Sequence, residues 1–312
     1  MYIGNLRRIF RRVLAYNRGS VSFLLYLICF SLLRNSHKNY VGYNVNEERV
    51  LTNFFEDLYW LSHMSLKLEI PRELLMKGIR EGVVLLKLAK AHKRVVKYVY
   101  LDNGEVGAET SDIVLLVTYK YIDLDGSARI IDDRISFFQI KLGKGDQIFD
   151  VPLNQWYLML KWPIFSYGNN VFDLCCCRAV PDACSFYLLL YRNKMFIDNT
   201  LSLPHKLNSI SLSTIYLSRI IERRLSNISY SCLKRGRRIS VKICGEGDLF
   251  LGMLWYLLLT HYGVYDRDGI RFMETLFPSL FDSDPPRSID EKISEERVSV
   301  GIRIIVTLRS GE

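Results

Sequence analysis

The sequence predicts an α/β protein with a mixed central β-sheet flanked by helices. Helical and strand-like segments alternate along the 312 residues, and the strand-like runs 112–122 and 134–142 are apolar on both faces. Strands of that kind belong in the centre of a sheet that helices cover on both sides. With 49% apolar and 12% aromatic residues, the chain can bury a large core, which excludes an intrinsically disordered protein.

Residues 1–46 form a basic N-terminal segment that contains seven Lys or Arg and no Asp or Glu. We expect one or two amphipathic helices over residues 1–35. They would form a buried helix pair, a membrane-surface or targeting segment, or a nucleic-acid-binding arm. The apolar run 21–33 is shorter than the roughly 18 to 20 residues that cross a bilayer, so no transmembrane span is expected.

Residues 47–205 are expected to form the α/β core. Asn46 is a candidate N-cap for a helix over 45–65, with Val50, Leu51, Phe54, Phe55 and Leu58 on its buried side. Further elements follow in order: a helix from Pro71 towards Lys93, strands at 95–101, 112–122 and 134–142, a helix at 150–161, a strand at 171–178, and a strand or buried helix at 185–192.

Residues 206–312 are expected to form a C-terminal α+β lobe, because the composition changes after His205. Its elements would be helices at 209–226, 248–261 and 268–277 and strands at 237–244 and 298–308. Residues 281–297 are rich in Asp, Ser, Pro and Glu, which indicates an exposed excursion.

Asp125-Gly126 predicts a hairpin between the runs 112–122 and 134–142, because Asp-Gly is a strong turn signal. A two-residue turn there places Asp112 opposite Gln139, and Lys141 then points to the same face. The charged stretch 132–134 is unfavourable within a strand. If the loop instead covers 123–134, the register shifts and these groups only end adjacent strands.

Asp112 at the start of one strand and Gln139-Ile140-Lys141 on the next form a pattern that resembles the PD-(D/E)xK restriction-endonuclease-like superfamily, with Gln in place of the second carboxylate. The resemblance implies a restriction-endonuclease-like core and Mg²⁺- or Mn²⁺-dependent hydrolysis of phosphodiester bonds, with DNA as the favoured substrate. It also implies that Asp112 is the principal metal ligand and that Gln139 supplies a neutral oxygen. Lys141 would position the attacking water and stabilise developing charge.

Other polar residues would complete such a site. Glu109 would add a second carboxylate to the metal, and Gln155 would contact substrate phosphate. In the family that this pattern resembles, a glutamate from the preceding helix often joins the site. Glu48 and Glu56 are both candidates for that position here.

Charge is sorted along the chain. Residues 102–150 contain ten Asp or Glu and five Lys or Arg, whereas residues 213–243 contain eight Lys or Arg and one Glu. An acidic centre for metal beside basic segments for phosphate suits an enzyme that acts on a polyanion. Lys87, Lys90, Arg94 and Lys97 would form a helical stripe, which is either a second contact or a solvated face. The expected nucleic-acid-binding residues are Arg223, Arg224, Lys234, Arg235, Arg237 and Arg238.

The seven cysteines include no CxxC pair. We expect them to be small buried side chains of a cytoplasmic protein, without zinc. Cys175, Cys176 and Cys177 would alternate faces on the strand 171–178 and so could not share one ion. Two other functions stay open: a non-catalytic nucleic-acid-binding protein on the same fold, and a membrane-surface or assembly protein that uses the basic N-terminal helix.

Overall fold

The structure is a computed structural model. It describes residues 3–41, 46–92, 95–100, 104–143, 148–192, 194–199, 234–235, 238–242, 254, 258, 263–282 and 298–311.

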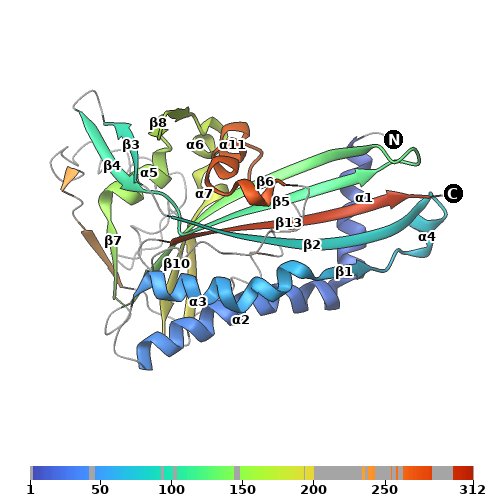
Figure 1. Ribbon diagram of the computed structural model, residues 1–312, viewed down its shortest axis with the longest axis horizontal. Coiled ribbons are helices and arrows are strands. Elements are labelled where there is room, and N and C mark those ends of the chain that lie inside the picture. Colours follow the sequence, from blue (N-terminus) through green and yellow to red (C-terminus); the bar gives the residue numbers. More distant parts are fainter. Residues whose placement is uncertain are drawn as a thin grey trace, which may run out of the picture.

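A seven-stranded mixed sheet forms the centre of the molecule (Figure 1). Its order is β1 (Ser65–Leu68), β2 (Ile79–His92), β13 (Val298–Ser310), β5 (Ile113–Ile122), β6 (Ala128–Leu142), β10 (Ser185–Tyr191) and β11 (Lys194–Asn199). The pairs β13–β5 and β6–β10 are parallel, and the other neighbours are antiparallel. The expected mixed α/β class is confirmed.

Two small sheets lie beside this centre. One has the order β4 (Glu105–Glu109), β3 (Val95–Val99), β8 (Phe165–Tyr167) and β9 (Asn170–Phe172), and the other pairs β12 (Arg238–Lys242) with β7 (Ile148–Pro152).

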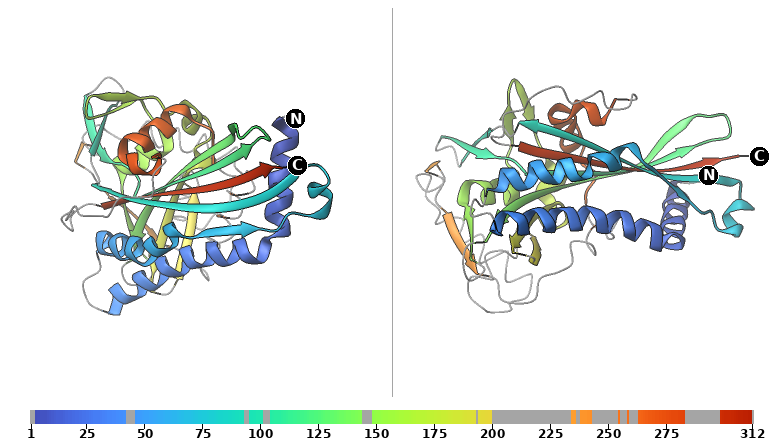
Figure 2. Two further views of the ribbon diagram at one scale, coloured as in Figure 1. Left: turned by 45° about the vertical axis from the view of Figure 1, so that its right-hand side comes forward. Right: turned by 60° about the horizontal axis from the view of Figure 1, so that its bottom comes forward.

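Helices cover both faces of the central sheet (Figures 1 and 2). One layer contains α1 (Ile3–Tyr16), α2 (Arg18–Val41), α3 (Glu47–Tyr59) and the short η1 (Trp60–His63). The other contains α5 (Leu153–Lys161), α6 (Cys175–Ala179), α7 (Pro181–Cys184), α11 (Arg267–Leu276) and η4 (Pro278–Leu280), while α4 (Arg72–Leu75) lies in the connection from β1 to β2. The sheet separates two hydrophobic cores: the first lies against α1, α2 and α3, and the second against α5, α6, α7 and α11. Along β5, Ile113 and Leu115 are buried in the first core, and Val114 and Leu116 in the second. The strand is therefore buried on both sides, as its composition predicts.

The helix α3 confirms its predicted cap and buried face. The side chain of Asn46 accepts a hydrogen bond from the Glu48 backbone N–H, and the five predicted apolar residues are buried. The basic N-terminal segment is helical, also as expected. Among the described residues, α2 is the one helix long and apolar enough to cross a membrane, and 44% of its apolar window is buried inside the protein.

The β5–β6 register agrees with the prediction at its functional end. Ile113 pairs with Phe138, so Asp112 comes opposite Gln139. The turn itself differs, because Asp123 and Ser127 close a longer loop in which Gly126 has a φ of +83°. The pairing shifts by one residue between Tyr119 and Lys120, and this irregularity compensates for the longer turn. The residues 132–134 lie within β6 and not in a loop.

Three expectations are wrong. The predicted helix from Pro71 to Lys93 is mostly the strand β2, so Lys87 and Lys90 lie on a strand, as does Lys97 on β3; Arg94 lies outside the described residues. Of the predicted strand 171–178, only the first two residues lie in β9, and residues from Cys175 onwards form the helix α6. The predicted boundary at residue 206 does not separate a lobe from the core, because β13 lies between β2 and β5 in the central sheet.

Other expectations are confirmed or lie outside the described residues. The strands β3, β10 and β12 and the helices α5 and α11 occur where helices or strands were expected. The predicted helix 209–226, nearly all of 248–261 and most of the excursion 281–297 lie outside the described residues.

Candidate functional site

The candidate site lies at the end of the β5–β6 pairing, where β6 runs on past the first residue of β5. β5 begins at Ile113, opposite Phe138, while β6 runs on to Leu142 and remains paired with β10 on its other side. The backbone N–H groups of Ile140 and Leu142 therefore have no β5 residue to donate to. Carboxylates accept from both: Asp112 from Ile140 at 2.7 Å and Glu47 from Leu142 at 3.4 Å. Two acidic side chains thus take the place of the missing strand.

Asp112 is held firmly at this position. Its backbone N–H donates to Phe138 O at 2.9 Å, and its carbonyl accepts from Val300 N–H at 2.8 Å. Its Oδ2 accepts from Gln139 Nε2 at 2.5 Å in addition to Ile140 N–H. Only 1% of Asp112 and none of Gln139 is exposed. The structure therefore brings Asp112 and Gln139 together in the interior of the protein.

Gln139 and Tyr187 leave two polar atoms unsatisfied beside this carboxylate. The residues are partners in the parallel β6–β10 pairing. Gln139 Oε1 and the Tyr187 hydroxyl are both buried without a hydrogen-bond partner. Burial, and to a lesser extent the charge of Asp112, raises the pKa of Tyr187 well above its usual value, so the phenol stays protonated. A buried acceptor and a buried donor are thus available for a further polar group.

Lys141 forms an ion pair with the helix layer. Its Nζ lies 2.9 Å from Glu47 Oε2, and only 5% of the residue is exposed. Glu47 is the first residue of α3, directly after the cap Asn46. Of the glutamates on α3, the structure places Glu47 against Lys141, whereas the sequence-based candidates were Glu48 and Glu56. The sequence could not show which of these three glutamates reaches Lys141, because all three lie on α3.

Glu109 is in contact with Gln155. Gln155 Nε2 donates to Glu109 Oε2 at 3.1 Å, and Gln155 is buried with Oε1 unpartnered. Of the predicted metal set, Asp112 and Gln139 are in contact, and Glu109 accepts a hydrogen bond from Gln155.

The donor set at Asp112 fits a weakly held divalent cation. A half-turn of the Gln139 amide would bring its unpartnered Oε1 towards Asp112 Oδ2, so that two oxygens could bind a hard cation. Asp112 supplies the single charge of this pair, and a neutral amide is a weaker ligand than a carboxylate. Mg²⁺ or Mn²⁺ would therefore also need water and substrate oxygens, which reach this buried pair only if the surrounding structure opens.

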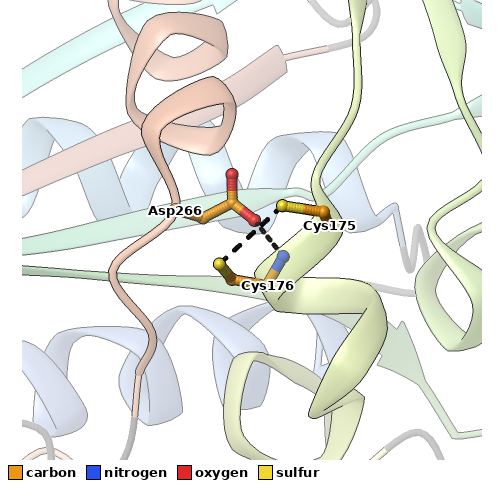
Figure 3. Close-up of side chains that lie close together, drawn as sticks. All are labelled: Cys175, Cys176 and Asp266. Atoms are coloured by element: carbon orange, nitrogen blue, oxygen red, sulfur yellow. Dashed lines mark hydrogen bonds between the residues drawn. The ribbon is translucent and has the colours of Figure 1, made fainter.

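A second cluster joins Cys175, Cys176 and Asp266 (Figure 3). It is the one group in the described part of the chain with at least three potential Cys, His, Asp or Glu ligand atoms within 4.8 Å of one another. The two sulfurs are 3.9 Å apart. Both cysteines lie on the helix α6 and not on alternate faces of a strand, contrary to the expectation.

Asp266 already has a structural task in this cluster. Its Oδ1 accepts from Gly269 N–H at 3.0 Å and so caps α11, while its Oδ2 accepts from the backbone N–H groups of Cys176 and Cys177 at the start of α6. Burial raises the pKa of the Cys176 thiol, and the negative charge of Asp266 adds to this. Because metals bind thiolates, a raised pKa opposes metal binding. We interpret the cluster as a structural link between the first turns of α6 and α11.

The predicted nucleic-acid contacts are described in part. Lys234, Arg235 and Arg238 are exposed, and Arg238 begins β12. Arg223, Arg224 and Arg237 lie outside the described residues. The five cysteines that are described, Cys29, Cys175, Cys176, Cys177 and Cys184, are free thiols.

The structure thus defines an α/β protein with a helix-covered mixed sheet, a buried Asp112–Gln139 pair at the end of the β5–β6 pairing, and a Lys141–Glu47 ion pair in which Glu47 is partly exposed. No protein-family model, no curated protein and no solved structure matches the chain.

Proposed function

We propose that the protein is a Mg²⁺-dependent nuclease of the PD-(D/E)xK type that hydrolyses phosphodiester bonds, with DNA as the favoured substrate and Mn²⁺ as an alternative ion. The supporting observation is the β5–β6 register, which puts Asp112 in contact with Gln139 and has Lys141 two residues further along the same strand. Glu47 supports the proposal independently, since it is a helix-borne acid that bonds Lys141.

Each side chain has a defined task in this proposal. Asp112 and the oxygen of Gln139 would hold the cation, which would neutralise phosphate charge and polarise the phosphorus centre. Lys141 would stabilise the negative charge that develops as water oxygen attacks phosphorus and the P–O bond to the leaving nucleotide breaks. Glu47, 2.9 Å from Lys141 Nζ and partly exposed, would accept the proton from that water.

Exposed basic residues support a polyanionic substrate. Lys234, Arg235 and Arg238 would neutralise phosphates, and binding should weaken steeply with salt. A cytoplasmic location is part of the same proposal, because free thiols persist in reducing compartments.

The sharpest test is Gln139→Glu, which restores a second carboxylate beside Asp112. If the pair holds a cation, the variant should cleave plasmid DNA faster than wild type in Mg²⁺, and Asp112→Asn should abolish cleavage. Mg²⁺ at ten times its dissociation constant should also raise the melting temperature of Gln139→Glu by about 3 °C, from mass action alone. This thermal shift does not depend on activity.

Gln155→Glu is the matched control, because Gln155 likewise donates from a buried amide to a carboxylate, that of Glu109. It places two acids together away from Lys141, so it should be destabilised without gaining cleavage or a Mg²⁺ shift. Equal Mg²⁺ shifts in the two Glu variants, or cleavage that persists in Asp112→Asn and Lys141→Ala, would reject the proposed site.

A non-catalytic nucleic-acid-binding protein on the same fold is the second candidate. The observation that favours it is the engagement of Asp112 Oδ2 by two donors in a buried position. In that case Gln139→Glu only loses stability, no variant cleaves DNA, and wild type binds DNA with a strong salt dependence.

A further inference from the structure

The outer face of α2 carries aromatic side chains where a core helix normally presents polar ones. Phe23 is 64% exposed, Tyr26 50% and Phe30 47%. Their spacing of three and four residues puts them on one helical face, and the rings of Tyr26 and Phe30 stack with centroids 5.8 Å apart. Tyr16, at the end of α1, is also exposed. Such a row is informative, because isolated exposed apolar residues are ordinary and contiguous ones are not.

Basic side chains flank this row. Arg18 precedes it, and Arg34 and Lys38 follow it on α2, all three exposed. Residues 1–46 contain no acidic residue. Two arginines of α1 are already engaged, since Arg7 pairs with Asp132 and Arg12 with Glu73. We name Phe23, Tyr26, Phe30 and Arg34, which follow one another at intervals of three and four residues, the α2 face; Tyr16 and Arg18 are exposed near its start. It combines apolar rings with positive charge, and so it complements a surface that has anionic groups on the outside and an apolar layer behind them.

The opposite side of α2 is committed to the protein. Val21, Leu25, Ile28 and Leu32 are fully buried in the first core. Asn35 is also buried, and its Nδ2 donates to Asp57 Oδ2 of α3 at 2.8 Å. α2 and α3 lie side by side in the layer below the sheet (Figures 1 and 2). Drawing α2 into a bilayer would expose this core and break the hydrogen bond to Asp57. The helix is therefore suited to lie along a membrane and not to cross it.

We propose that the α2 face docks on the surface of an anionic phospholipid membrane. Phe23 and Phe30 would enter the boundary between headgroups and acyl chains, with the Tyr26 hydroxyl at headgroup level. Arg18 and Arg34 would pair with lipid phosphates while their stems cover apolar surface. This docking uses neither Asp112 nor Lys141, so it holds or fails independently of the nuclease proposal.

Cosedimentation of the full chain with vesicles tests the proposal. We expect binding to vesicles of phosphatidylcholine mixed with phosphatidylserine, little binding to phosphatidylcholine alone, and release by high salt. The triple variant Phe23→Ser, Tyr26→Ser, Phe30→Ser should lower the partition coefficient about tenfold or more. Arg18→Glu with Arg34→Glu should abolish the preference for anionic lipid. Both variants should melt like wild type, because they alter exposed residues.

Leu124→Ser with Ile164→Ser is the matched control, since both residues are exposed and lie outside the α2 face; its binding should equal that of wild type. Equal binding of the triple variant and wild type would overturn the proposal. So would resistance to alkaline carbonate extraction, which marks a spanning helix. A wild-type dimer that the triple variant converts to monomer, without vesicle binding by either, would assign the face to self-association instead.

Discussion

Glu47→Gln should destabilise the protein more than Lys141→Met does, although both remove the same ion pair. The side chain of Lys141 is 6% exposed and that of Glu47 is 33% exposed. Loss of the glutamate leaves a buried ammonium group without its counter-charge, whereas loss of the lysine leaves a carboxylate that water can reach. Removing one partner of a buried pair costs about 3–5 kcal/mol, and a position at the rim reduces this to about 2–3 kcal/mol for Glu47→Gln.

Lys141→Met should cost only about 0–1 kcal/mol, because methionine fills much of the lysine volume and Glu47 regains water. At about 2 °C per kcal/mol for a chain of this size, the two variants should melt about 4 °C apart. Urea unfolding of wild type, both single variants and the double variant measures the coupling. The double variant should resemble Lys141→Met. If Lys141→Met proves as destabilised as Glu47→Gln, the reasoning from unequal burial is wrong.

Two further substitutions, Gly301→Ala and Asp133→Asn, test the packing and the charge of the sheet, and Gly19→Ala is the control for the first. Gly301→Ala should destabilise by about 1–3 kcal/mol in urea unfolding, because a Cβ there would lie 2.7 Å from Phe277 Cγ and 2.8 Å from Leu280 Cδ1; Gly19→Ala, on an open helix surface, should stabilise by about 1 kcal/mol, and equal loss at both sites would refute the packing argument. Burial raises the pKa of Asp133 above its ordinary 3.8, so its contribution favours folding below that pH and is lost as pH rises through the folded-state pKa. Asp133→Asn should flatten this decline in unfolding free energy, and an unchanged pH slope would contradict the expectation.

Sequence periodicity predicted the elements that local chemistry determines. The cap Asn46 and the apolar face of α3 are local, as is the alternation that buries β5 on both sides. The register that joins Asp112 to Gln139 was also predictable, although the turn was wrong and an irregularity in β6 compensates for it. Agreement in register therefore does not establish agreement in turn type.

Other features depend on residues distant in sequence. β2 contains Leu, Lys and Ala, which favour helix, but pairing with β13 along its whole length makes it a strand. The helix start at Cys175–Cys177 is capped by Asp266, which lies 90 residues after Cys176. The choice of Glu47 over its neighbours follows from where the sheet places Lys141. None of these partners is visible within a local window of sequence.

The place of β13 between β2 and β5 has a consequence for biosynthesis. The Ser299 hydroxyl donates to Ser111 O across a separation of 188 residues. On the side of β5 that faces away from β6, the pairing partner is β13, a strand that is synthesised late. While the polypeptide emerges from the ribosome, β2 and β5 would each display an unpaired apolar edge. We therefore expect the nascent protein to need chaperone shielding until residues 298–310 have been synthesised.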